Sequence, residues 1–266
     1  RTVLESGVSA NLSCGGVYFG APEDFSPDAC GDCRNQIALT EEWNGAGDGQ
    51  IKVDASIHAE YTSNPSLWEW MAGYAAEHGL GMHVHVSETR SEHESCLQKY
   101  GKTPVALLDR YGVTAAHCVW VSDADMELMV QRNITAVHNP VSNLKLASGA
   151  ARVPRLLERG VNVALGTDGV ASNNSHDLFE EIKLAALLHK GIGLDPAAVT
   201  GNGNYQWGAG PETKHRGHRP GQNGGPDPGG PGRPQPVPLP RCGGGFGLLG
   251  PGLQRGDEYG PGTGHI

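Results

Sequence analysis

Short apolar segments alternate with helix-like segments from residue 8 to residue 190, and this alternation restricts the possible folds most strongly. Helical patterns separate the apolar segments, and Gly191 is expected to close the last helix. Strands that alternate with helices at this spacing predict β-α units and a parallel sheet. Residues 8–18 are predicted to be a strand that runs into a Gly-rich loop. The other predicted strands are 51–57, 81–87, 113–119, 134–140 and 161–168, and the predicted helices are 35–44, 64–78, 91–100, 103–111, 123–132, 150–159 and 176–190.

Ionisable residues stand at or just beyond the carboxyl ends of five consecutive predicted strands. In a β/α barrel these strand ends form the face that carries the active site. A single buried histidine is common in a protein core, but a series at five strand ends is hard to explain as packing. The pattern therefore indicates a metal site or an acid–base site built from His58, His85 with Glu88, His117, His138 with Asn139, and Asp168.

The segment 81–89 carries the densest part of this pattern. His83 and His85 are two residues apart, so they share one face of the predicted strand, and Glu88 follows where the strand gives way to a loop. A metal-binding imidazole with a carboxylate close by suits the activation of water for hydrolysis. The alternative for this segment alone is a pair of core histidines and a surface glutamate.

Charge and composition exclude several classes of protein. Residues 1–200 carry 25 acidic and 14 basic side chains, which argues against DNA or RNA as a partner. No apolar run approaches the roughly 20 residues of a membrane helix, and the first residues lack the features of a signal peptide. Cys30 and Cys33 form a lone C-x-x-C pair, which is a weak signal for zinc or redox chemistry. We expect a cytoplasmic protein with reduced thiols.

Four motifs resemble the amidohydrolase superfamily, and within it the 5-methylthioadenosine/S-adenosylhomocysteine deaminase group. They occur in the expected order at 85–89, 116–118, 138–146 and 166–174, and the resemblance covers about residues 1–198. It implies a (β/α)₈ TIM barrel that holds one divalent metal, usually zinc with Fe²⁺ as an alternative. It also implies a small-molecule purine nucleoside as the substrate and allows a homo-oligomer.

The resemblance assigns roles to individual residues. His85 and Asp168 would be metal ligands. Glu88 would shuttle a proton to the purine ring nitrogen, His117 would hydrogen-bond the attacking water, and Asp168 would take a proton from that water. These residue types suit the chemistry, since neutral imidazole and carboxylate are zinc ligands and a carboxyl group can act as a general acid.

Other residues receive a binding role or a structural role from the same resemblance. His58 and Ser172, together with Glu88, lie where such enzymes contact the nucleoside. His138 is expected to be a structural residue at a strand end. His83 is expected to face the barrel interior without binding the metal.

The chain departs from the family pattern at its beginning. The family's first strand carries a His-x-His pair that supplies two more metal ligands, and no such strand precedes residue 8. The six predicted units therefore correspond to strands three to eight of an incomplete α/β barrel. A metal held by His85 and Asp168 alone is expected to bind weakly.

A second departure begins near Thr200, so we expect a partial barrel over 1–198 and a low-complexity tail over 199–266. Residues 201–266 include 21 glycines and 11 prolines, a composition typical of disorder. One coding string allowed by residues 220–230 reads, one base later, as Pro-Gly-Lys-Met-Ala-Asp-Leu-Ile-Leu-Val-Asp, which would suit the end of an amidohydrolase. We therefore expect a frameshifted, non-native tail, with a true flexible linker or partner-binding arm as the alternative.

Three functions follow as hypotheses. The first is a metal-dependent hydrolytic deaminase of adenosine-type nucleosides, impaired here by truncation. The second is another amidohydrolase, similar to guanine deaminase or to a triazine chlorohydrolase. The third is a non-catalytic remnant of such an enzyme.

Overall fold

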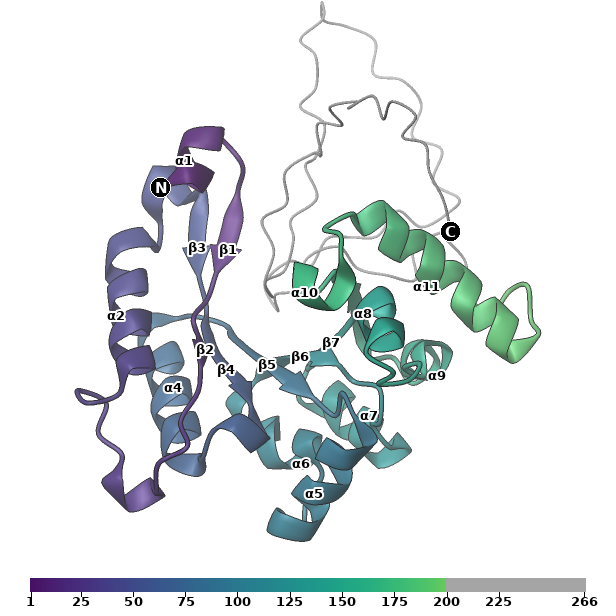
Figure 1. Cartoon of the computed structure of the whole chain (residues 1–266), viewed down its shortest axis with the longest axis horizontal. Coiled ribbons are helices and arrows are strands. Elements are labelled where there is room, and N and C mark those ends of the chain that lie inside the picture. Colours follow the sequence, from purple (N-terminus) through teal and green to yellow (C-terminus); the bar gives the residue numbers. More distant parts are fainter. Residues whose placement is uncertain (200–266) are drawn as a thin grey trace, which may run out of the picture.

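A six-stranded parallel sheet forms the centre of the molecule in a computed structural model that describes residues 1–199 (Figure 1). The strand order is β2-β4-β5-β6-β7-β8, so strands that follow one another in this series also lie side by side. This arrangement confirms the predicted α/β class with a parallel, barrel-type sheet. The strands are β2 (Gly15–Gly16), β4 (Ala55–Ala59), β5 (Met82–Val86), β6 (Val113–His117), β7 (Thr135–His138) and β8 (Asn162–Leu165).

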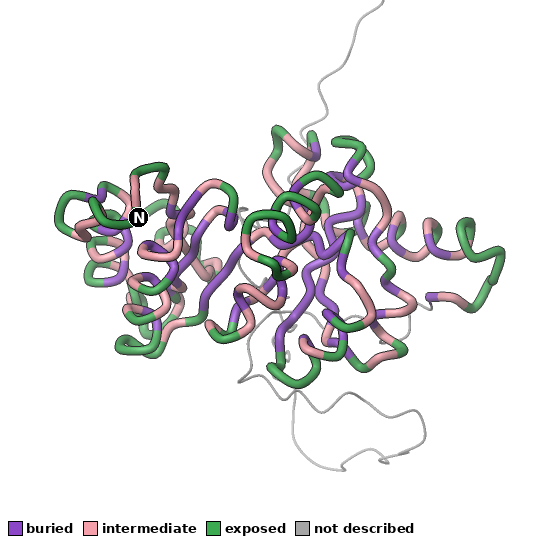
Figure 2. Tube along the Cα trace, turned by 90° about the horizontal axis from the view of Figure 1, so that it is seen from below, coloured by how far each residue is buried: buried purple, intermediate pink, exposed green. Residues whose placement is uncertain are grey.

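Helices connect successive strands and cover the sheet. The buried residues run along the strands, while the outer sides of the helices are exposed (Figure 2). The core lies between sheet and helices, where Trp68 and Met71 pack with Ile57. The helices are α1 (Thr2–Ser6), α2 (Gly31–Trp43), α3 (Ala46–Gly49), α4 (Pro65–His78), α5 (Arg90–Tyr100), α6 (Pro104–Leu108), α7 (Asp123–Gln131), α8 (Pro140–Lys145), α9 (Val153–Glu158), α10 (Val170–Asn173) and α11 (Leu178–Gly193).

Side-chain caps fix where several helices begin. Asn64 accepts a hydrogen bond from the Leu67 N–H at the start of α4, and Pro65 occupies the first helical position. Thr89 and Ser122 begin α5 and α7 with reciprocal capping boxes. These local signals place each helix directly after the strand end that it follows.

The first two predicted strands are each broken in two, which corrects the sequence prediction. Segment 8–18 contains β1 (Ala10–Leu12) and β2, and segment 51–57 contains β3 (Ile51–Val53) and the start of β4. Strands β1 and β3 form a separate two-stranded parallel sheet.

Asp54 explains the break, because it separates β3 from β4 and uses its side chain to join three segments. Its carboxylate accepts hydrogen bonds from the Asn11 side chain at 2.5 Å, the Gly81 N–H at 2.9 Å and His83 Nε2 at 2.7 Å. Burial opposes the charged form of Asp54, yet these donors keep the pKa of its carboxyl group below its usual value.

Helix boundaries also differ from the predictions. The prediction that Gly191 closes the last helix is wrong, because α11 continues to Gly193 and ends at Leu194, which has a left-handed φ of 51°. The short helices α8 and α10 were not predicted, since six and four residues carry too little periodicity to show a pattern.

The expectations about the tail, about membrane helices and about the cysteines can also be compared with the structure. The predicted disorder and frameshift of the tail lie outside the described residues. Within residues 1–199, every helix is too short or too polar to cross a lipid bilayer. The five cysteines in this part of the chain are free thiols.

Candidate active site

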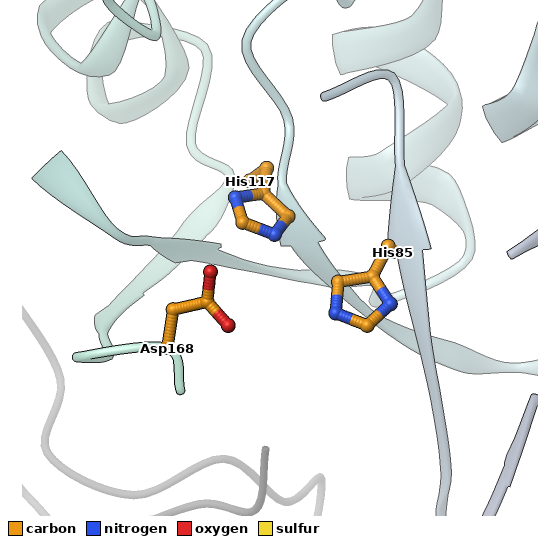
Figure 3. Close-up of side chains that lie close together, drawn as sticks. All are labelled: His85, His117 and Asp168. Carbon is orange, nitrogen blue, oxygen red and sulfur yellow. The ribbon is translucent and has the colours of Figure 1, made fainter. Parts of the chain in front are cut away.

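Three side chains from three different strand ends converge at one place in the structure. His85 is the penultimate residue of β5, His117 is the last residue of β6, and Asp168 follows β8. One ligand atom from each of them lies within 4.8 Å of the other two. The imidazole rings and the carboxylate face a common space (Figure 3). The structure thus brings these three candidate residues together at one edge of the sheet.

A backbone carbonyl orients the imidazole of His85. Its Nδ1 donates a hydrogen bond to the carbonyl oxygen of His58 at 2.5 Å, so the ring's lone pair is on Nε2. Burial, together with the nearby His117, lowers the pKa of His85 to about 4. The ring is therefore neutral at physiological pH, which is the state that binds a metal.

His117 is oriented in the same way by a side-chain amide. Its Nδ1 donates to Oδ1 of Asn143 at 2.8 Å, and the ring is buried. On the other side of the ring, Nε2 lies 3.8 Å from Oε2 of Glu88. Glu88 Oε1 accepts a hydrogen bond from the Ser148 hydroxyl at 3.2 Å. Glu88 thus lies at the edge of the three-residue group.

Asp168 is held by two donors and by an uncommon backbone conformation. The Ser142 hydroxyl donates to Oδ2 at 2.6 Å, and the Gly169 N–H donates to Oδ1 at 2.7 Å. Asp168 has a φ of 61°, and left-handed φ values also occur at Ser87 and His117. Such conformations cost free energy in non-glycine residues and often concentrate at functional sites.

Of the two further residues expected to contact the nucleoside, His58 lies next to the three-residue group and Ser172 does not contact it among residues 1–199. His58 lies beside the group, with its ring centroid 4.8 Å from that of His85, and its Nδ1 hydrogen-bonds Thr62 at 2.9 Å. Ser172 lies on α10, four positions after Asp168, where its N–H donates to Gly169. No contact described for residues 1–199 joins the Ser172 side chain to the group.

His83 and His138, the two histidines expected to have interior or structural roles, lie outside the group. His83 is buried and pairs with Asp54 near the beginning of β5. His138 is buried at the end of β7, with its Nε2 3.4 Å from Nε2 of His189. Both positions agree with interior or structural roles.

Sequence reasoning missed the residues that orient the group. Ser142 and Asn143 belong to the short helix α8, and Ser148 follows it. Glu92 binds the backbone around Glu88 and had a sequence signal, since it completes a Thr-x-x-Glu capping box with Thr89. Ser142 and Asn143 lie within the motif at 138–146, which supported the family resemblance without giving them a role, and Ser148 carried no recognisable signal.

The donor set fits a metal ion such as zinc. Catalytic zinc sites commonly use three protein ligands chosen from histidine and carboxylate, which leaves one position for water. Hydrogen bonds that fix the remaining imidazole nitrogens, as at His85 and His117, are the usual support for such ligands. The group could therefore hold one metal ion.

Comparisons with known proteins agree with this geometry. Residues 7–202 match the amidohydrolase family. The chain is 44% identical over 204 residues to a 5-methylthioadenosine/S-adenosylhomocysteine deaminase from Dictyoglomus thermophilum, covering 75% of this chain and 46% of that protein. It is also 44% identical over 204 residues to a 5'-deoxyadenosine deaminase from Methanosarcina acetivorans, with the same coverage.

A solved structure shows the same relationship. An adenosine deaminase from Xanthomonas campestris, crystallised with bound zinc, is 32% identical and superposes with a TM-score of 0.66 over 74% of this chain and 45% of that one. The chain spans a little under half the length of the relatives it matches. Family match, sequence identity and strand-end geometry lead to one conclusion: the chain belongs to the amidohydrolase family.

Proposed function

We propose that this chain carries the proton-transfer and metal-binding side of a hydrolytic deaminase that acts on adenosine-type nucleosides. The observation that supports this most directly is the convergence of His85, His117 and Asp168 beside Glu88. The substrate class is proposed because relatives are named as deaminases of 5-methylthioadenosine, S-adenosylhomocysteine and 5'-deoxyadenosine.

In this proposal His85 and Asp168 hold one divalent metal, with His117 within reach of the same ion. Zinc is the metal we propose, with Fe²⁺ as the alternative. Bound zinc would lower the pKa of a water molecule toward about 7 and make it a nucleophile at neutral pH. The neutral state of His85 makes the ring available as a ligand.

Each residue at the site has a distinct part in the reaction. His117 Nε2 would hold the attacking water, and Asp168 would accept its proton. Glu88 would donate a proton to the purine ring nitrogen beside the carbon that bears the amine. A carbon–oxygen bond would form at that carbon, and the amine would take up the proton held by Asp168. The carbon–nitrogen bond would then break, ammonia would leave, and the new hydroxyl would return a proton to Glu88. His58 and Ser172, with Glu88, would contact the nucleoside.

The remaining expectations also stay proposals. We place the protein in the cytoplasm, with a small-molecule substrate, no nucleic-acid partner, and a homo-oligomer as an open possibility. The alternative functions are a guanine deaminase or triazine chlorohydrolase activity. Solved proteins of those classes share the fold at 20–22% identity, which supports the architecture alone.

A non-catalytic remnant is the second candidate function. It would follow if the group of three residues that could hold a metal, found among residues 1–199, does not bind one. This alternative predicts little zinc after purification and no turnover.

The test is an assay of zinc-supplemented protein against a panel of substrates. We expect ammonia release from 5-methylthioadenosine, S-adenosylhomocysteine or 5'-deoxyadenosine, and zinc near one ion per chain. Release from guanine or from a chlorinated triazine alone would favour the alternative enzymes. Absence of release from every compound would contradict the deaminase proposal for this polypeptide.

A further inference from the structure

A buried carboxylate binds the backbone of the loop that carries Glu88. Glu92 Oε1 accepts a hydrogen bond from the Ser87 N–H at 2.8 Å. Its Oε2 accepts from the Glu88 N–H at 2.7 Å and from the Thr89 N–H at 3.3 Å. A capping box needs only one such bond, to the residue that caps the helix. Glu92 therefore fixes a whole turn of backbone in addition to capping α5.

The backbone of residues 87–89 is expected to change conformation if its hydrogen bonds to Glu92 are lost. Ser87 has a left-handed φ of 50°, which is costly for a residue with a side chain. The Glu88 side chain extends from this turn and lies between the Ser148 hydroxyl and the His117 ring. Any change in the backbone at Ser87 or Glu88 would move the Glu88 carboxyl group away from these two partners.

A second buried carboxyl group lies against Glu92. Glu60, in the turn that follows β4, is 1% exposed and hydrogen-bonds the Glu92 side chain. Its Oε2 is buried and has no hydrogen-bond partner among residues 1–199. Burial raises the pKa of the Glu92 carboxyl group as well, but three N–H donors stabilise its charge, so we assign the shared proton to Glu60. Burial and the charge of Glu92 raise the pKa of Glu60 to about 8, in agreement with this assignment.

We propose that Glu92 is a positioning residue for Glu88, and that protonated Glu60 holds the Glu92 carboxylate in place. This inference rests on the proposed role of Glu88 as the proton shuttle. Glu60 and Glu92 touch neither the metal-binding group nor a reacting atom, so their effect is exerted through the Ser87–Thr89 backbone.

The chain contains a matched control for this arrangement. Asp125 forms the corresponding capping box at the start of α7, where it accepts the Ser122 N–H at 2.7 Å. It is also buried, at 3% exposure. Its contacts are with Ser122 and Thr103 and do not involve the loop that carries Glu88. A variant of Asp125 therefore shows the effect of losing a buried capping carboxylate alone. A variant of Glu92 adds the loss of the contacts to the backbone around Glu88.

The experiment compares Glu92→Gln, Glu60→Gln, Glu60→Ala and Asp125→Asn in the full chain with zinc. Three quantities are measured: amide hydrogen exchange at residues 87–89, the ¹³C carboxyl resonance of Glu88, and kcat and KM for ammonia release. The Glu88 resonance is identified by its loss in Glu88→Gln.

Glu92→Gln places an NH₂ group against N–H donors, so we expect exchange at residues 87–89 to accelerate about tenfold or more. The Glu88 resonance should shift, and kcat should fall about tenfold with KM nearly unchanged. Glu60→Gln can still donate to Glu92 and should resemble the unmodified protein, whereas Glu60→Ala should resemble Glu92→Gln. Asp125→Asn should affect exchange only at the start of α7.

Unchanged exchange or an unchanged Glu88 resonance in both Glu92→Gln and Glu60→Ala would overturn the positioning role. Equal effects of Glu60→Gln and Glu60→Ala would overturn the assignment of the proton to Glu60. If Glu92→Gln does not fold, Glu60→Ala decides the outcome, because it removes the group proposed to hold the Glu92 carboxylate and leaves the Glu92 side chain itself unchanged. Absence of turnover in the unmodified chain would contradict the proposed function alone, since exchange and the resonance still report on the position of Glu88.

Discussion

Nε2 of His117 lies 3.8 Å from Oε2 of Glu88, although the two residues come from different β-α units. The distance is longer than a hydrogen bond and short enough for one small molecule to contact both groups. Because His117 donates through Nδ1 to Asn143, its other nitrogen is an acceptor that faces the Glu88 carboxyl group. This arrangement brings an imidazole nitrogen and a carboxyl group to the same side of the group that could hold a metal.

Replacement of Glu88 by Gln should reduce ammonia release by about 10²–10⁴-fold, the usual contribution of a positioned general acid. Zinc content should not change, because Glu88 is not among the three residues that could hold the metal. Steady-state kinetics and metal analysis of the same sample check both parts. The control is Glu94→Gln, which alters an exposed carboxylate on α5 that pairs with Arg90. An equal loss in the two variants would contradict the role of Glu88.

Replacement of Ser142 by Ala should weaken zinc binding by about tenfold. The Ser142 hydroxyl donates to Asp168 Oδ2 at 2.6 Å, and loss of a partner that supports a metal ligand commonly costs about 10–100-fold in affinity. Competition with a zinc chelator measures the change without any need for turnover. Ser91→Ala, at an exposed position on α5, is the control and should leave the affinity unchanged. Identical affinities for Ser142→Ala and the unmodified chain would show that Asp168 needs no such support.

The closeness of the three candidate residues could be predicted from the sequence, because their placement follows from topology. The carboxyl ends of parallel strands lie at one edge of the sheet, so His85, His117 and Asp168 had to approach one another once the strands were assigned. The spacing of 81–89 also placed His83 and His85 on one face of β5. The two residues have different surroundings because they stand at different positions along the strand. His83, nearer its beginning, binds Asp54, and His85, nearer its end, lies with His117 and Asp168.

The supporting contacts could not be predicted in the same way. Ser142 and Asn143 act through α8, a helix of six residues that is too short to be stable alone and forms because of its surroundings. The break at Asp54 likewise depends on donors from Asn11 and His83, which are distant in sequence. Contacts of this kind leave no periodic pattern in the chain.

Stability should fall as the pH is lowered from about 6.5 toward 3, and His138 should contribute to this fall. Burial, with smaller effects of His189 and His117, lowers the pKa of His138 to about 3. Its pKa in the unfolded chain is about 6.5. The unfolded state therefore binds the proton more readily at acid pH, so stability is complete above about 6.5 and decreases below it.

The test for His138 is urea unfolding at several pH values between 7 and 4. His138→Gln should show a shallower loss of stability with acid than the unmodified chain, because one neutral buried imidazole has been removed. Some acid sensitivity should remain, since the pKa of His85 is also lowered, to about 4. His78→Gln, at an exposed position near the end of α4, should keep the original slope. Equal slopes in all three proteins would contradict the prediction.

Replacement of Gly166 by Ala should destabilise the fold by about 1–3 kcal/mol, the usual cost of overpacking. An added Cβ would collide with Oδ1 of Asn139 and would lie 2.9 Å from Cγ1 of Val137. Neither neighbour can move freely, because Val137 is buried on β7 and the Asn139 amide lies 3.4 Å from His117 Nδ1. The control is Gly169→Ala, where a Cβ would meet nothing within 4 Å. In urea unfolding, the free energy of unfolding of Gly166→Ala should therefore be lower than that of Gly169→Ala by at least about 1 kcal/mol. Equal values would mean that the chain at Gly166 can move away from β7 without loss of stability.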